Sequence, residues 1–165
     1  EYICAVNERV SRNESLAWGK LRTGRVGVSG TDYEPPVPEK DCVERELEGI
    51  MRYSDPKERA EEYFCYAVRS QLFWDGNKRT STIVASKILI EAGVGVLTIG
   101  KADAVDFNET LLHYYDTANP EPLKRCLNHC IKTLDPISQI KSAAERETAE
   151  LLSQKPETPA RGQHR

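Results

Sequence analysis

Long apolar runs, a surplus of positive charge and a regular set of cysteines are all missing from this sequence of 165 residues. The longest apolar stretches, such as residues 83–90, are too short to cross a bilayer, and the charges spread over positions 1–18 do not fit a secretory signal. The net charge of -3 gives no basic field of the kind that attracts nucleic acids. Five irregularly spaced cysteines do not form a disulfide framework, which favours a reducing, cytoplasmic location. We therefore expect one main domain with neither membrane nor nucleic-acid partners.

Helical periodicity of the apolar residues dominates most of the chain. It predicts helices over residues 2–15, 41–52, 56–71, 77–92, 103–117 and 120–134. The helix at 77–92 is apolar on almost all sides, which is typical of a helix at the centre of its domain. A short β-branched run at 94–99 predicts a strand or an extended turn.

A glycine-rich segment at residues 22–33 breaks the helical pattern. Gly24, Gly27 and Gly30 interrupt any helix there, and valines alternate with smaller or polar residues, which predicts a small β-hairpin or an extended flap. The fold class that follows is all-α with one small hairpin. We expect a main domain at residues 1–137, a charged helix at 138–154 and a disordered tail at 155–165.

The segment at residues 73–80, Phe-Trp-Asp-Gly-Asn-Lys-Arg-Thr, places a tight turn directly before the most apolar predicted helix. The first turn of a helix leaves its N–H groups unpaired, and its dipole favours an anion. Gly76 lets the backbone approach a ligand closely, while Lys78 and Arg79 oppose the dipole unless an anion joins them. Asp75 is a hard oxygen ligand suited to Mg²⁺. The pattern predicts a site for a Mg²⁺-bound phosphate chain, and an ordinary turn with a solvated basic end is the alternative.

The same segment resembles the signature of the Fic/Doc family, His-x-Phe-x-Asp/Glu-Gly-Asn-Gly/Lys-Arg. The residues that fall in register are Phe73, Asp75, Gly76, Asn77 and Arg79. The resemblance extends through the flap and the proline-rich connector after it, over roughly residues 1–135. It implies a Fic-type helical domain whose loop, Lys78 included, binds the phosphates of ATP and whose Asp75 holds Mg²⁺. It also implies a protein target docked on the flap, residues 22–33, by strand addition.

Three positions depart from the family pattern. Gln71 stands where the family has its catalytic His, which takes a proton from the target hydroxyl. A Gln amide cannot accept that proton near neutral pH, and losing a general base typically costs ~10²–10⁴-fold in rate. Lys78 replaces the second Gly, as in the Doc branch, which moves phosphate rather than AMP. Thr82 occupies the position of a second Arg found in many AMP-transferases.

Gln71 is either natural or an inactivating substitution, and the unusual Ser70 and Leu72 beside it favour a natural residue. The sequence is then compatible with three functions. The first is altered or weak transfer of AMP or phosphate to protein hydroxyls, with Gln71, Lys78 and Arg79 at the reacting centre. The second is a catalytically silent nucleotide-binding or protein-interaction module. The third is a toxin held by an antitoxin.

The family's inhibitory motif, Ser/Thr-x-x-x-Glu-Gly/Asn, does not occur in the sequence, so we expect any inhibition to come from a regulatory chain. A homodimer is a further expectation. Outside the loop, Arg22 and Arg25 could touch the target or the phosphates, with simple solvation as the alternative. Tyr114 and Tyr115 could flank the base of a nucleotide, with packing as the alternative. His113 could be a displaced general base.

Overall fold

The computed structural model describes residues 1–15 and 17–133. The predicted charged helix at 138–154 and tail at 155–165 lie outside these residues, as do the last residues of the predicted domain. No helix within the described ranges is long and apolar enough to cross a membrane.

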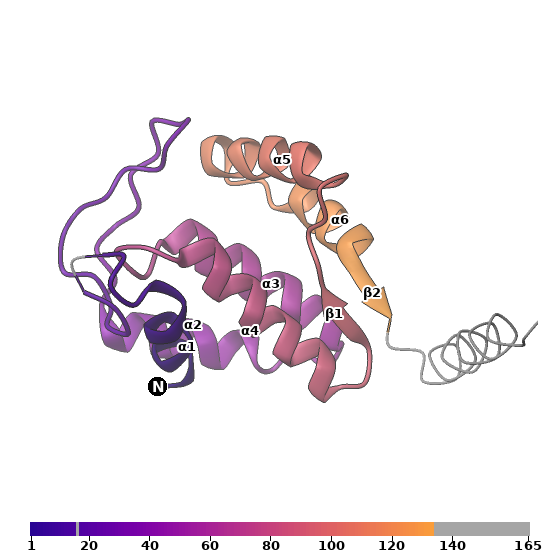
Figure 1. The fold of residues 1–165 in the computed structure, drawn as a ribbon. Coiled ribbons are helices and arrows are strands. Elements are labelled where there is room, and N and C mark those ends of the chain that lie inside the picture. Colours follow the sequence, from indigo (N-terminus) through magenta and orange to yellow (C-terminus); the bar gives the residue numbers. More distant parts are fainter. Residues whose placement is uncertain (16, 134–165) are drawn as a thin grey trace, which may run out of the picture. The chain divides into compact units, whose positions relative to one another are not determined.

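Helices make up most of the described chain, which confirms the all-α prediction (Figure 1). They are α1 (Tyr2–Ser11), α2 (Lys40–Ile50), α3 (Pro56–Ser70), α4 (Asn77–Glu91), α5 (Ala104–Thr117) and α6 (Glu121–Cys130). The two strands, β1 (Gly95–Leu97) and β2 (Ile131–Thr133), pair antiparallel with Val96 opposite Lys132. Because residues 131–133 pair with β1, α6 ends four residues before its predicted end at 134.

The segment at residues 22–33 is an extended loop, the second of its two predicted forms, and the small hairpin expected in the fold class does not form there. Its one backbone turn is closed by Thr31, whose N–H donates to the carbonyl of Val28 at 3.3 Å. The Arg22 guanidinium donates to the carbonyl of Gly24 and to those of Pro35 and Pro36 in the connector that follows the segment. The small sheet of the fold is therefore β1–β2, and 22–33 is an unpaired flap.

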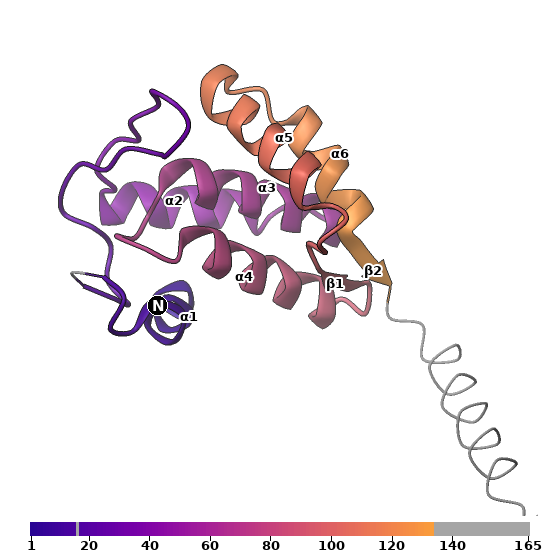
Figure 2. The ribbon, with the colours of Figure 1, turned by 45° about the horizontal axis from the view of Figure 1, so that its top comes forward.

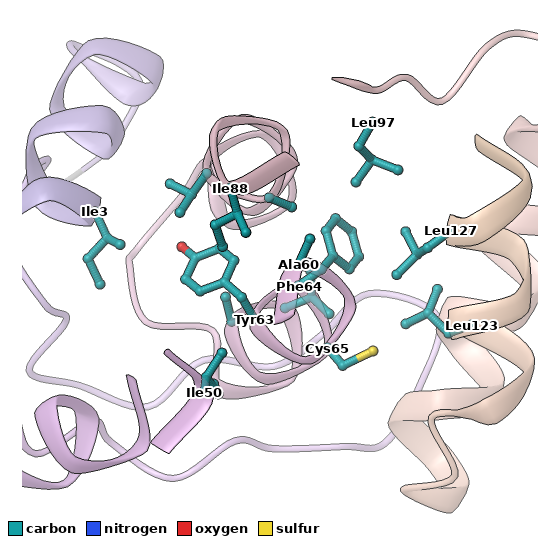
Figure 3. Packing of buried hydrophobic residues seen from close by; sticks show 14 of the residues in the cluster. Ile3, Ile50, Ala60, Tyr63, Phe64, Cys65, Ile88, Leu97, Leu123 and Leu127 are labelled. Carbon is teal, nitrogen blue, oxygen red and sulfur yellow. The ribbon is translucent and has the colours of Figure 1, made fainter. Parts of the chain in front are cut away.

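The core surrounds α3 and α4, which lie side by side at the centre of the helical assembly (Figure 2). Helix α3 begins where Asp55 accepts a hydrogen bond from the Lys57 N–H at 2.8 Å, with Pro56 at the first helical position. Figure 3 shows side chains from several elements meeting around α3, with Phe64 near Leu97 and Leu127. This packing fixes the C-terminus of α3 beside the N-terminus of α4, and the short connection between them carries the predicted site.

Candidate functional site

An open cavity of about 400 Å³ lies where the α3–α4 connection faces the flap and helix α5. Its polar end is formed by the connection and the first turn of α4, which contribute six of the seven predicted site residues: Gln71, Asp75, Gly76, Asn77, Lys78 and Arg79. Its apolar end is formed by α5, including Leu111 and Leu112, and by Val28 of the flap. The seventh predicted residue, Phe73, is buried beneath the loop in the core.

Asn77 holds the loop in shape. Its carboxamide oxygen accepts from the Phe73 N–H at 2.9 Å, and its amino group donates to the Phe73 carbonyl at 2.8 Å. The same amino group donates to the carboxamide oxygen of Gln71 at 3.0 Å. Asn77 is buried, so these bonds satisfy backbone groups that solvent cannot reach. In this structure Asn77 and Phe73 thus stabilise the loop, and their contact with a nucleotide stays a prediction.

Helix α1 supports the loop from below through a fully buried Asn7. The Asn7 amino group donates to the Asp75 carbonyl at 2.9 Å, and its oxygen accepts from the Gly19 N–H at 3.0 Å. Gly76 adopts φ 74° directly above α1, where an added Cβ would lie 3.1 Å from a methyl of Val10 and 3.2 Å from Asn7. Sequence reasoning missed Asn7, although a polar residue on the apolar face of the predicted N-terminal helix, between Val6 and Val10, is a signal that could have found it.

The first turn of α4 presents unpaired donors to the cavity. The first intrahelical bond is from the Thr80 N–H to the Gly76 carbonyl at 2.8 Å, and no side chain caps the helix. The N–H groups of residues 77–79 consequently have no acceptor within the part of the chain that the structure describes. Lys78 is exposed beside them, and no ion pair involves it among the described residues. This end of the cavity is built to receive an anion.

The Arg79 guanidinium is half exposed and turned toward the end of α1. One nitrogen contacts Glu14 at 2.6 Å and lies 3.4 Å from Asp75, while another donates to the Val10 carbonyl at 3.1 Å. The hydrogen bond with Glu14 raises the pKa of Arg79, so this side chain stays cationic. Asp75 itself accepts from the Gly76 N–H at 2.6 Å through its other oxygen.

Comparison with known proteins agrees with this geometry. A family model described as Fic/DOC family matches residues 1–89, more than half of the chain. The protein belongs to the Fic/DOC family. Its fold is similar to that of BepC, a VirB-translocated effector protein from Bartonella tribocorum solved with bound AMPPNP, with a TM-score of 0.61 and 13% identity over 81% of this chain and 74% of that one. No curated protein sequence matches the chain.

Gln71, at the position that the resemblance aligns with the signature His, has an unusual backbone conformation. It ends α3 in the left-handed region, with φ 43° and ψ 60°. Its amino group donates to the Val68 carbonyl at 2.7 Å and to the Tyr115 hydroxyl at 3.0 Å, and its oxygen accepts from Asn77. Every polar atom of the side chain is therefore engaged by the protein, and none of them can take up a proton near neutral pH.

Helix α5 carries three further candidate residues, Tyr115, His113 and Tyr114. Burial raises the pKa of the Tyr115 phenol to about 12, and its ring stacks on Tyr33 with centroids 5.8 Å apart. His113, considered as a possible displaced base, is exposed on α5 and does not line the cavity. Tyr114 is buried with its ring beneath Arg69, which agrees with the packing alternative.

Arg22 of the flap is unexpectedly buried. It is 1% exposed and does not line the cavity, so it meets neither solvent nor the polar end of the cavity. Burial lowers the pKa of its guanidinium, and yet Arg side chains remain cationic at neutral pH. Arg25, by contrast, lies at the surface in an ion pair with Glu34, as the solvation alternative expected. No pattern in the sequence distinguishes these two flap arginines.

Proposed function

We propose that this Fic/DOC protein binds a Mg²⁺-complexed adenine nucleotide at the loop before α4, and that it transfers AMP or phosphate to protein hydroxyls slowly or not at all. The observation that carries the proposal is the contrast within one cavity. The phosphate end keeps its free N–H groups and the exposed Lys78, while the base position holds a fully hydrogen-bonded Gln71. The volume of about 400 Å³ lies within the range of small-molecule pockets.

Asp75 is suited to bind Mg²⁺ through its carboxylate. One carboxylate oxygen is used by the Gly76 N–H, and the other lies 3.4 Å from Arg79 on a side chain that is 48% exposed. No cluster of three His, Cys, Asp or Glu residues forms a metal site of its own in residues 1–15 and 17–133. Mg²⁺ characteristically combines one or two carboxylates with substrate phosphates, and when bound it would neutralise phosphate charge.

The chain's own residues support binding and electrostatic stabilisation more than proton transfer. The N–H groups of the first α4 turn and the Lys78 ammonium would hold the phosphate oxygens, and Arg79 lies at the rim to stabilise developing charge. Phosphoryl transfer has a loose transition state that places little demand on a base, so slow transfer is compatible with Gln71. Complete silence is the second candidate, favoured by the fully hydrogen-bonded Gln71 amide, which cannot act as a base near neutral pH.

A protein target would dock on the flap. Within residues 25–30 one backbone carbonyl, that of Val28, closes a turn, and the remaining backbone groups find no backbone partner in the described structure. An extended segment can therefore add to this flap as a strand. A regulatory or antitoxin chain and a homodimer remain further proposals that follow from the family.

The proposal is tested by binding and transfer measured side by side. Calorimetry with ATP and Mg²⁺ should detect binding to the natural protein, weakened about 10-fold or more by Lys78→Ala, a loss typical of a hydrogen bond between charged groups. Lys101→Ala, an exposed lysine outside the cavity, is the matched control and should bind as the natural protein does. Absence of ATP binding by the natural protein would overturn the proposal.

Transfer is followed with ATP labelled at the α- or the γ-phosphate, using bacterial lysate as the source of targets. Gln71→His should label protein at least ~10²-fold faster than the natural protein, the lower range for a general base. The labelled phosphate identifies the group that is moved. Equal, rapid labelling by both proteins would show that position 71 has no base role here.

A further inference from the structure

Arg22, which lies outside the loop, carries a buried charge. Arg22 is buried to 1% exposure, and no carboxylate pairs with it in the described structure. Buried cations are normally paired with an acid, because an isolated charge is costly to remove from water. Arg22 is instead surrounded by backbone carbonyls, and the places of these carbonyls in the chain indicate what it does.

Five carbonyl groups accept hydrogen bonds from the three guanidinium nitrogens. The Nε–H donates to the Gln71 carbonyl at 2.5 Å, and one terminal nitrogen donates to Gly24 at 2.5 Å. The other terminal nitrogen contacts the carbonyls of Ser70, Pro35 and Pro36 at 3.3, 3.2 and 2.6 Å. One side chain thus joins the C-terminus of α3 to the start of the flap and to the connector after the flap. The cation also lies where the dipole of α3 is negative.

The contact with Gln71 addresses a conformational problem at that residue. A residue with a Cβ rarely adopts φ 43°, and it does so only where its surroundings fix it. The Arg22 backbone N–H donates to the Leu72 carbonyl at 3.0 Å. Arg22 thus binds two consecutive carbonyls of the bend, that of Gln71 through its side chain and that of Leu72 through its backbone. The left-handed turn is what directs the side chain of position 71 into the cavity beside Asn77 and Tyr115.

We propose that Arg22 is a positioning residue, which fixes the backbone of residue 71 in its left-handed conformation and fixes the flap relative to it. The inference rests on the proposed function for its kinetic consequence but not for its geometry. Flap and base position then form one unit: a target held on the flap meets the side chain of residue 71 at a set distance. Gly24 strengthens this unit, since an added Cβ there would lie 2.6 Å from the Trp74 ring of the loop.

The geometric test uses NMR on the natural protein and on Arg22→Lys. In the natural protein we expect a hydrogen-bond scalar coupling between Arg22 Nε and the Gln71 carbonyl carbon, and coupling constants at Gln71 that report a positive φ. Absence of either overturns the proposal without any variant having to fold. In folded Arg22→Lys, the Gln71 side-chain amide and the Trp74 indole signals should both shift, and unchanged signals would equally overturn it.

The kinetic test uses the Gln71→His background. Arg22→Lys should lower kcat by about 10- to 100-fold, because a misplacement of the order of 1 Å at a reacting group has that effect, while the ATP dissociation constant changes less than about 2-fold. Arg59→Lys is the matched control, since Arg59 also donates to a backbone carbonyl, that of Tyr53, at 2.9 Å, away from the cavity. An equal loss in both variants, or a loss confined to ATP binding, contradicts a positioning role.

Failure of this inference and failure of the proposed function remain distinguishable. If Gln71→His transfers nothing, the NMR couplings still decide the role of Arg22. If Gln71→His transfers label and the NMR couplings are absent, the proposed function is supported and the positioning role of Arg22 is refuted.

Discussion

The close packing of Gly76 against helix α1 leads to a specific prediction for Gly76→Ala. Gly76 has φ 74°, and its missing side chain leaves room for α1: an added Cβ would lie 3.1 Å from Val10 and 3.2 Å from both Asn7 and Ser11. Gly93, after α4, is the matched control. It has nearly the same backbone conformation, with φ 69°, but an added Cβ there meets nothing within 4 Å.

The two substitutions share one energetic term and differ in the other. A residue with a Cβ in the left-handed region costs about 1–2 kcal/mol, which applies to both glycines. Overpacking adds about 1–3 kcal/mol at Gly76 alone, because α1 is buried against the loop and cannot move without breaking the Asn7 bonds. We therefore expect a loss of about 2–5 kcal/mol for Gly76→Ala and of about 1–2 kcal/mol for Gly93→Ala.

Urea unfolding of the full chain measures both losses, provided that the denaturant slope is the same in all three proteins. ATP binding measured at a temperature where every protein is folded adds a second readout, and it should fall for Gly76→Ala only. If the two variants lose the same stability, α1 does not support the loop as closely as the structure shows, and the reasoning from packing is refuted.

Two further predictions concern buried polar groups. Asn77→Ala leaves the buried Phe73 N–H and carbonyl without partners and should lower the free energy of unfolding by about 2–4 kcal/mol, whereas the exposed Asn108→Ala should change it by under about 0.5 kcal/mol in the same urea titration. Burial raises the pKa of Glu61 to about 7 from its ordinary 4.5, against an opposing attraction from Lys124. Between these two pH values the folded state keeps a proton that the unfolded state has released, so this group lowers stability as pH rises through the window, by up to roughly 3 kcal/mol. Glu61→Gln should flatten that part of the stability–pH curve, the exposed Glu48→Gln should leave it unchanged, and an unaltered curve for Glu61→Gln would refute the assignment.

Local signals in the sequence were sufficient for most of the helices. Asp55 and Pro56 mark the start of α3, and the apolar run after Gly76 marks α4, because caps and periodicity act within a few residues. The end of α6 could not be predicted in this way. It is set by pairing of residues 131–133 with β1, more than thirty positions earlier in the chain, and such long-range pairing leaves little trace in a single segment.

The sequence predicted where the candidate site lies, but not which residues support the loop. The loop residues 75–79 carry their own signal, since cations at a helix N-terminus conflict with the dipole. Asn7 and Arg22 act on that loop from 68 and 49 positions away. The apolar neighbours of Asn7 hint that it is buried, but nothing in the local sequence of either residue names its partner. For the flap the sequence left a hairpin and an extended form open, because glycines and valines are compatible with both; the structure has the extended form, held at Gly24 and in the connector by the buried Arg22 guanidinium.

The hydrogen bonds that hold the loop also indicate whether the side chain of residue 71 can be replaced without changing the shape of the loop. Asn7, Asn77 and Arg22 bind backbone atoms of the loop, so their hydrogen bonds do not depend on which side chain residue 71 carries, except for the single bond from Asn77 to Gln71. A histidine at this position would lose that bond and those to Val68 and Tyr115 while the left-handed turn stays fixed from outside. The chemistry of residue 71 and the shape of the loop are thus separable. A gain of transfer by Gln71→His would accordingly report on the missing base alone, because the phosphate end of the cavity does not have to be rebuilt for that side chain to act.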